Sequence, residues 1–141
     1  MSHDASKVQM GTTLSNIREV SNKKGTIAAG LAVRLKSDDT ISVALADGSP
    51  MGISLGKDLS NTGETAIARK GIQVPILLTN GFTPTKGAQV NISDTTGKAI
   101  ASGAGATAVN AFYSSGALSA VDEAGSAIAD GAALIDFPGG L

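Results

Sequence analysis

Short stretches of alternating apolar and polar residues, separated by glycine, proline, asparagine and aspartate, run along most of the chain. Ala32–Leu35 (AVRL) and residues 41–45 (ISVAL) show this pattern, and the polar segment KSDDT lies between them. A period of two places alternate side chains on opposite faces of a β-strand, and a segment such as KSDDT is typical of a turn. The two stretches therefore predict a hairpin in an all-β domain of short strands.

The segment GETAIARKGIQVPILL, residues 63–78, repeats the alternation on both sides of Lys70 and Gly71. It predicts two strands with a break at that pair. Pro75 has no N–H group to donate to a neighbouring strand. We therefore expect the second strand to lie at an edge, to start a new segment or to contain a bulge.

The sequence KGAQVNISDTTGKAI, residues 86–100, contains a polar cluster that could be taken for a phosphate grip, a phosphorylatable aspartate loop or a turn. Ala88, Val90 and Ile92 alternate before the cluster, and apolar residues resume at position 99. This arrangement favours the connection of a β-hairpin, in which Asp94 caps its own turn and Gly97 adopts a positive φ.

The last third of the chain, from about residue 99 to 133, is rich in alanine, glycine and serine and predicts a thin core. Leu118, Val121, Ala124 and Ile128 have roughly helical spacing. Gly125, however, costs a helix about 1 kcal/mol relative to alanine. Whether residues 118–130 form a helix is left open, and we expect at most one short helix in the chain. Residues 132–137 (AALIDF) predict a closing strand that ends at the following Pro-Gly-Gly.

The first fourteen residues show little periodicity, with Val8, Met10 and Leu14 as isolated apolar positions. This predicts an extended arm over residues 1–14, followed by a single domain, a small β-barrel, over residues 15–141. A chain of 141 residues is long enough for one domain with a normal core. The unpaired N–H and C=O groups of an extended arm can add to another sheet as an edge strand.

The composition removes several classes of function. The formal net charge is -1, with one tyrosine, three phenylalanines and no tryptophan, so the chain lacks the basic excess and stacking platforms of nucleic-acid binding. Cysteine is absent, which excludes disulfide frameworks and thiolate chemistry. No apolar run approaches the roughly 18 residues of a membrane span, and the first residues lack the pattern of a secretory signal, so we expect synthesis in a cytoplasm.

The candidate catalytic groups do not form a catalytic arrangement. The histidine is His3, in the predicted arm, so a nucleophile has no convincing general base. Adjacent carboxylates occur at Asp38-Asp39 and Asp122-Glu123, but neighbours in a strand point to opposite faces and make poor dyads. We predict no catalytic residues, and that the protein is not an enzyme.

Two glycine-containing segments fail as ligand loops. Residues 52–58 (GISLGKD) space their glycines one residue too closely for a phosphate-binding loop and place Asp58 where serine or threonine should bind magnesium. Residues 94–105 (DTTGKAIASGAG) supply only the first ligand of a calcium loop. No cofactor and no metal site is predicted.

Taken in order, five segments resemble the small head decoration, or capsid cement, proteins of tailed bacteriophages, in particular those built on a small β-barrel called a β-tulip: AAGLAVRL, ISVALADGSPMGISLG, GETAIARKGIQVPIL, TKGAQVNISDTTGKAI and GAALIDFPG. The resemblance covers Ala28 to Ile100 and, less closely, the final strand. It lies in the order of the segments rather than in any single one.

The resemblance implies structural work on a virus particle. Such proteins bind the outside of an expanded capsid, commonly as trimers, and clamp neighbouring subunits of the major capsid protein. It implies that this chain lies on the outer surface of a virion, forms a homo-oligomer, with a trimer favoured, and uses its arm to join a capsid strand. Val8, Met10 and Leu14 are then the expected capsid contacts.

The alternative is a β-rich binding module of a phage particle, such as the base of a head fibre, a tail structural domain or a carbohydrate-binding domain. Carbohydrate-binding surfaces commonly use exposed aromatic rings. Phe82, Phe112, Tyr113 and Phe137 are the aromatic residues of the chain. They support sugar binding only weakly.

Overall fold

The computed structural model describes residues 7–10, 17–43, 49–56, 63–122 and 124–141, and over these residues the chain is all-β, with eleven strands and no helix. This confirms the predicted fold class. The strands are β1 (Lys7–Gln9), β2 (Ile17–Lys24), β3 (Ala32–Leu35), β4 (Ile41–Ser42), β5 (Pro50–Ser54), β6 (Glu64–Leu77), β7 (Gln89–Ser93), β8 (Ala99–Ile100), β9 (Ala106–Tyr113), β10 (Leu118–Val121) and β11 (Ala127–Phe137).

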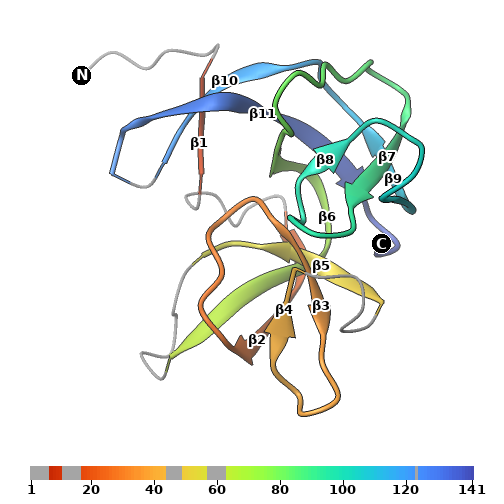
Figure 1. Ribbon diagram of the computed structural model, residues 1–141. Helices are drawn as coiled ribbons and strands as arrows, with labels where there is room; N and C mark the ends of the chain where they lie inside the picture. The colour runs from red at the N-terminus through yellow and green to blue at the C-terminus, as the bar shows by residue number, and fades with distance from the viewer. Residues whose placement is uncertain (1–6, 11–16, 44–48, 57–62, 123) are drawn as a thin grey trace.

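The strands form one open sheet in the order β4-β3-β5-β6-β11-β9-β7-β8, with β2 also paired to β6 and β10 paired to both β11 and β1. Isolated bridges join Lys24 to Thr40 and Leu78 to Ala99, so both ends of the sheet curl back. Figure 1 shows the result as two groups of strands, β2 to β5 in one and β7, β8, β9 and β11 in the other, with β6 running between them.

The segment predicted as two strands is one continuous strand that changes partners at the predicted break. Up to Gly71, β6 pairs with β2 and β5, and from Gly71 onward it pairs with β11. Gln73 has a φ of 51°, and its N–H donates to the Asp136 carboxylate at 2.7 Å. Pro75 lies opposite Leu134 of β11. Among the described strands, β11 is the one paired with β6 at this position. Of the three alternatives for this strand, an edge fits locally, because β2 and β5 pair with the earlier part of β6, although β6 as a whole lies inside the strand order.

Three clusters of buried side chains hold the sheet together. The main cluster takes inward-facing residues from most strands, among them Ile53, Val74, Ile92, Ile135 and Phe137. A second cluster joins Val33, Ile41 and Ile67, and a third joins Met10, Ala120 and Ala132. Each large side chain that is fully buried stabilises the fold by roughly 1.5–3 kcal/mol, so the isoleucines, valines and Phe137 supply most of the stability, whereas the alanines allow the strands to approach closely.

The alanine-rich last third contains strands that its composition did not indicate. In β9, Val109, Ala111 and Tyr113 are buried, while the residues between them are exposed. The question left open for residues 118–130 is answered by strands, because this segment contains β10 and the start of β11. The turn between these strands explains the difference: the Asp122 carboxylate accepts the N–H groups of Ala124 and Ser126, both at 2.9 Å, and Gly125 has a φ of 89°.

The SDTTGK segment connects β7 to β8 as a hairpin, as predicted, but a different residue caps the turn. The Ser93 hydroxyl accepts the N–H groups of Thr95 at 3.4 Å and Thr96 at 3.3 Å. The Asp94 carboxylate instead accepts the Thr107 hydroxyl of β9 at 2.6 Å. The predicted capping role of Asp94 is therefore wrong, since a cross-strand hydroxyl engages its side chain.

Gly97 joins this hairpin to the other group of strands. Its φ is 75°, as the turn prediction requires, and its carbonyl accepts the N–H of Ala32 on β3 at 2.8 Å. A Cβ at this position would lie 2.6 Å from the Ala32 carbonyl oxygen. The loop therefore positions β7 and β8 against β3.

Gly97→Ala is expected to lower the free energy of unfolding by more than Gly105→Ala. Both glycines have a positive φ, 75° and 78°, but an added Cβ at Gly105 meets nothing within 4 Å. Gly105→Ala should cost about 1–2 kcal/mol for the left-handed backbone alone, and Gly97→Ala should cost a further 1–3 kcal/mol for the overlap with β3. Urea unfolding of both variants measures the difference. Equal losses would show that the contact with Ala32 does not fix the loop.

Candidate functional site

Residues 7–10 of the predicted arm form a strand on the chain's own sheet. The strand β1 pairs in parallel with β10, with Val8 opposite Ala120, and the Met10 N–H donates to the Val121 carbonyl at 3.0 Å. Among the described strands, β1 pairs with β10. Figure 1 shows β1 at the part of the β10–β11 hairpin that extends away from the two groups of strands. The candidate site is therefore the seat of an extended peptide segment.

The side chain of Met10 anchors this strand. Only 3% of Met10 is exposed, and it packs against Ala120 and Ala132, with Ala29, Leu77, Ile128 and Val8 at the margin. A Cβ on Gly30 would overlap the end of the Met10 side chain, so Met10 fills the space next to bare backbone. Methionine suits such a seat because its unbranched side chain adapts to irregular gaps.

We call the surface formed by Ala29, Leu77, Ala120, Ile128 and Ala132 the arm groove. A cavity of about 390 Å³ adjoins it, lined mainly by small and apolar residues together with the side chain of Asp122. Two features define what the groove can bind: a backbone edge on β10, and a depression for one long apolar side chain. Chemically, it is a receptor for an extended strand.

The sequence pointed to Val8, Met10 and Leu14, and the structure brings the first two together on the groove. Leu14 and His3 lie outside the described residues. The side chains of Val8 and Met10 turn toward the chain's own β10–β11 hairpin rather than away from it. The groove itself was missed, because Ala29, Leu77 and Ala132 are distant in sequence and carry no motif.

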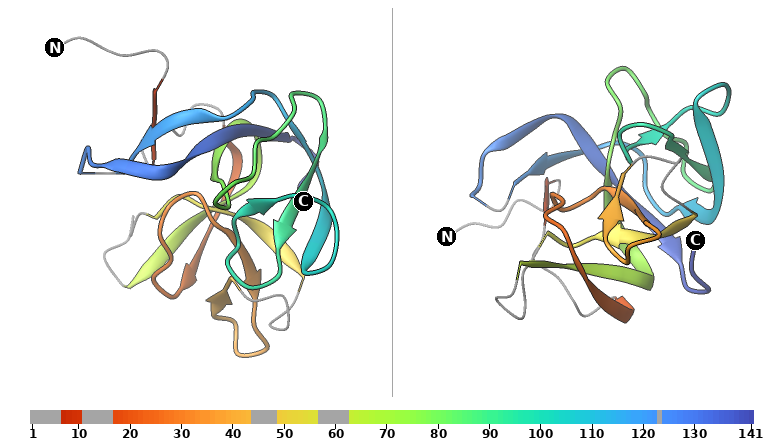
Figure 2. Two further views of the ribbon diagram at one scale, coloured as in Figure 1. Left: turned by 45° about the horizontal axis from the view of Figure 1, so that its top comes forward. Right: turned by 60° about the horizontal axis from the view of Figure 1, so that its bottom comes forward.

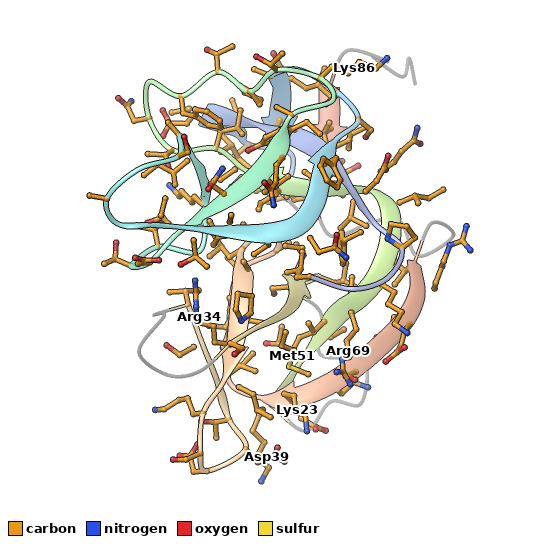
Figure 3. The ribbon with its side chains drawn as sticks, turned by 90° about the vertical axis from the view of Figure 1, so that its right-hand side faces the viewer. Lys23, Arg34, Asp39, Met51, Arg69 and Lys86 are labelled. Carbon is orange, nitrogen blue, oxygen red and sulfur yellow. The ribbon has the colours of Figure 1, made fainter. Side chains whose placement is uncertain are left out.

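The carboxylate pair Asp38-Asp39 lies at an exposed turn, as expected of solvated residues. The Thr40 hydroxyl donates to the Asp38 carboxylate at 2.6 Å and the Thr40 N–H does so at 3.1 Å, and these hydrogen bonds lower the pKa of Asp38. Asp39 forms an ion pair with Lys23 of β2 at 3.0 Å, which Figure 3 shows at the opposite end of the molecule from Lys86. These contacts fasten a turn.

Arg34 and Tyr113 carry polar groups and are buried. Arg34 of β3 is fully buried, and its guanidinium donates to the Val43 carbonyl. Burial raises the pKa of Tyr113 to about 12. Sequence reasoning did not single out Arg34, since its neighbours predict only an ordinary strand.

Among the described residues, no group of three or more histidine, cysteine, aspartate or glutamate side chains could hold a metal ion. The same part of the chain contains no helix with the length and apolar character needed to cross a membrane. No protein-family model and no curated protein matches the chain. The class that can be defined is thus an all-β protein with an N-terminal strand seated in an apolar groove.

Proposed function

We propose that this protein is a structural virion protein that binds the outer surface of an expanded phage capsid and clamps neighbouring subunits of the major capsid protein. It acts as a homo-oligomer, with a trimer favoured, and is made in the host cytoplasm before it joins the particle. The observation that carries the proposal is the short N-terminal strand β1, which pairs with β10 and packs through Met10. The order of the segments that resembles phage decoration proteins supports it independently.

The terms that favour and oppose pairing of β1 in its groove are of similar size. Ordering four backbone residues costs about 4–8 kcal/mol at 1–2 kcal/mol each. Burying Met10 and part of Val8 contributes roughly 2–4 kcal/mol, and the hydrogen bonds of the short ladder add about 1–4 kcal/mol in total. Because the terms nearly cancel, the strand can leave its groove for an equivalent site at small cost.

An edge strand of a capsid subunit offers such an equivalent site. Strand addition supplies main-chain hydrogen bonds, and pockets for alternate side chains supply specificity. Val8 and Met10 would then exchange their contacts on β10 for contacts on the shell, and Leu14 would extend them. One domain held by a strand on each of several neighbours resists their separation, because all the strands must detach together.

The test is to mix the purified protein with expanded, undecorated shells of the phage that encodes it. We expect the protein to sediment with the shells, to saturate at a fixed ratio to capsid subunits, and to raise the temperature at which the shells open. Shells that already carry the protein serve as the control and should bind no more of it. If the protein stays in the supernatant at saturating concentrations, the proposal is wrong.

A β-rich binding module of the particle is the second candidate. Phe112 on β9 supports this candidate, because 48% of the residue is exposed. In the described parts of the chain, the other large hydrophobic residues with exposed surfaces are Val20 and Leu35, which are not aromatic. Binding of oligosaccharides by the free protein, together with failure to bind shells, would favour this candidate over the capsid role.

A further inference from the structure

We propose that, in solution, the arm groove of one copy binds β1 of a second copy, so that copies of the chain are joined by exchanged N-terminal strands. This interaction concerns the free protein and requires no shell. It assigns the groove a partner of known sequence, the segment Lys7 to Met10 of another molecule.

The groove is shaped for that segment. Its backbone edge accepts the parallel ladder in which Val8 lies opposite Ala120, and the depression over Gly30 holds Met10. An arm from a second copy makes the same contacts as the chain's own arm. The contacts therefore favour neither arm over the other, and the choice depends on protein concentration. Exchange of an identical element is a low-cost route to oligomers.

The location of the groove makes the exchange possible without unfolding the rest of the molecule. The cluster around Met10 is separate from the two clusters that hold the remaining strands. Figure 2 shows β1 beside the projecting end of the β10–β11 hairpin, outside the two groups of strands. When β1 leaves, the other two clusters keep their side chains, while Ala120, Ile128 and Ala132 lose their cover. That uncovered apolar surface favours another arm over water.

Arm and groove are different surfaces, so one copy can donate its arm to a neighbour and accept an arm from another. Head-to-tail contacts of this kind close into a ring when the rotation between copies permits it. Two copies that trade arms form the smallest such assembly, and three form a trimer.

The test uses the absence of cysteine in the chain. A tagged Val8→Cys variant is mixed with an untagged Ala120→Cys variant, both are incubated at high concentration and oxidised, and the products are separated by mass without reductant. Adjacent strands lie about 4.8 Å apart, within the range that a disulfide spans. We expect the mixed disulfide, at the sum of the two chain masses, as the main cross-linked product.

A Val8→Cys variant mixed with Phe112→Cys serves as the matched control, because Phe112 lies on β9, a strand that does not pair with β1. The double variant Val8→Cys/Ala120→Cys checks that the two positions can be linked at all. The proposal is overturned if this double variant closes within one chain while the mixed pair gives no more cross-linking than the control.

The outcome is independent of the capsid role. Mixed disulfides together with failure to bind shells would overturn the capsid proposal alone. Monomers that bind shells and form disulfides only within one chain would overturn strand exchange alone.

Discussion

Deleting Met1 to Leu14 is expected to lower the affinity of the protein for expanded shells by at least about tenfold, while the rest of the chain stays folded. The deletion removes β1, and with it the main-chain ladder and the buried side chain of Met10. Because 1.4 kcal/mol corresponds to a factor of ten, a net gain of that size when the arm moves from its own groove to the shell is enough for this effect. Sedimentation with shells over a range of protein concentrations measures it.

The matched control is a shorter deletion, Met1 to Asp4, which keeps the whole of β1 and should bind shells as the full chain does. Circular dichroism should show the same β-rich spectrum for both deletions, since the other two clusters contain no residue of the arm. Equal binding by the two deletions would refute a role for the arm in attachment.

The double variant Val8→Cys/Ala120→Cys tests whether shell binding requires β1 to leave β10, and not merely that the arm is present. When oxidised, it holds β1 on β10 by a covalent bond, and when reduced it releases the strand. Oxidation should therefore weaken shell binding about as much as the deletion, and reduction should restore it. A disulfide between the cross-strand neighbours Gln89 and Phe112, each replaced by cysteine, controls for oxidation itself because it leaves β1 untouched. Full binding by the oxidised arm variant would show that β1 stays in its groove on the shell.

The parts of the fold that the sequence predicts are those determined by neighbouring residues. The hairpin of β3 and β4, the hairpin around Gly97 and the closing strand at Phe137 all follow from alternation and turn residues. The strand β9 was missed because alanine occupies several of its positions, and burial of Val109 and Tyr113 depends on strands far away in the chain. Local pattern is weak when the side chains are small.

The same limit applies to the candidate site. Val8 and Met10 were singled out as apolar residues in a polar segment, and both have buried contacts. Their seat could not be predicted, because it combines residues 29, 77, 120, 128 and 132, which meet only through sheet pairing. The turn at Asp122 decides the outcome: it converts a segment with roughly helical spacing into the hairpin that receives the arm.

Gly52→Ala is expected to cause a large loss of stability, although it adds a single methyl group. Gly52 lies in β5, opposite Val33, and it is buried against β6. A Cβ there would overlap the carbonyl oxygen of Ala68 and lie 2.8 Å from a methyl carbon of Ile67. The obstacle is backbone in the middle of a strand, so it cannot be relieved by a change of rotamer. We expect a loss of about 3 kcal/mol, at the upper end of the usual cost of overpacking.

For a chain of this length, such a loss lowers the midpoint of thermal unfolding by roughly 10 °C. Gly116→Ala is the matched control: its φ is not in the left-handed region, and an added Cβ has one ordinary contact, with the Pro84 carbonyl oxygen at 3.8 Å. That variant should change the midpoint by no more than about 2 °C in either direction. If Gly52→Ala unfolds within the same narrow range, β5 and β6 do not approach each other as closely as the structure shows. Because Gly52 lies far from β1 in the strand order, shell binding by the folded fraction should be unchanged.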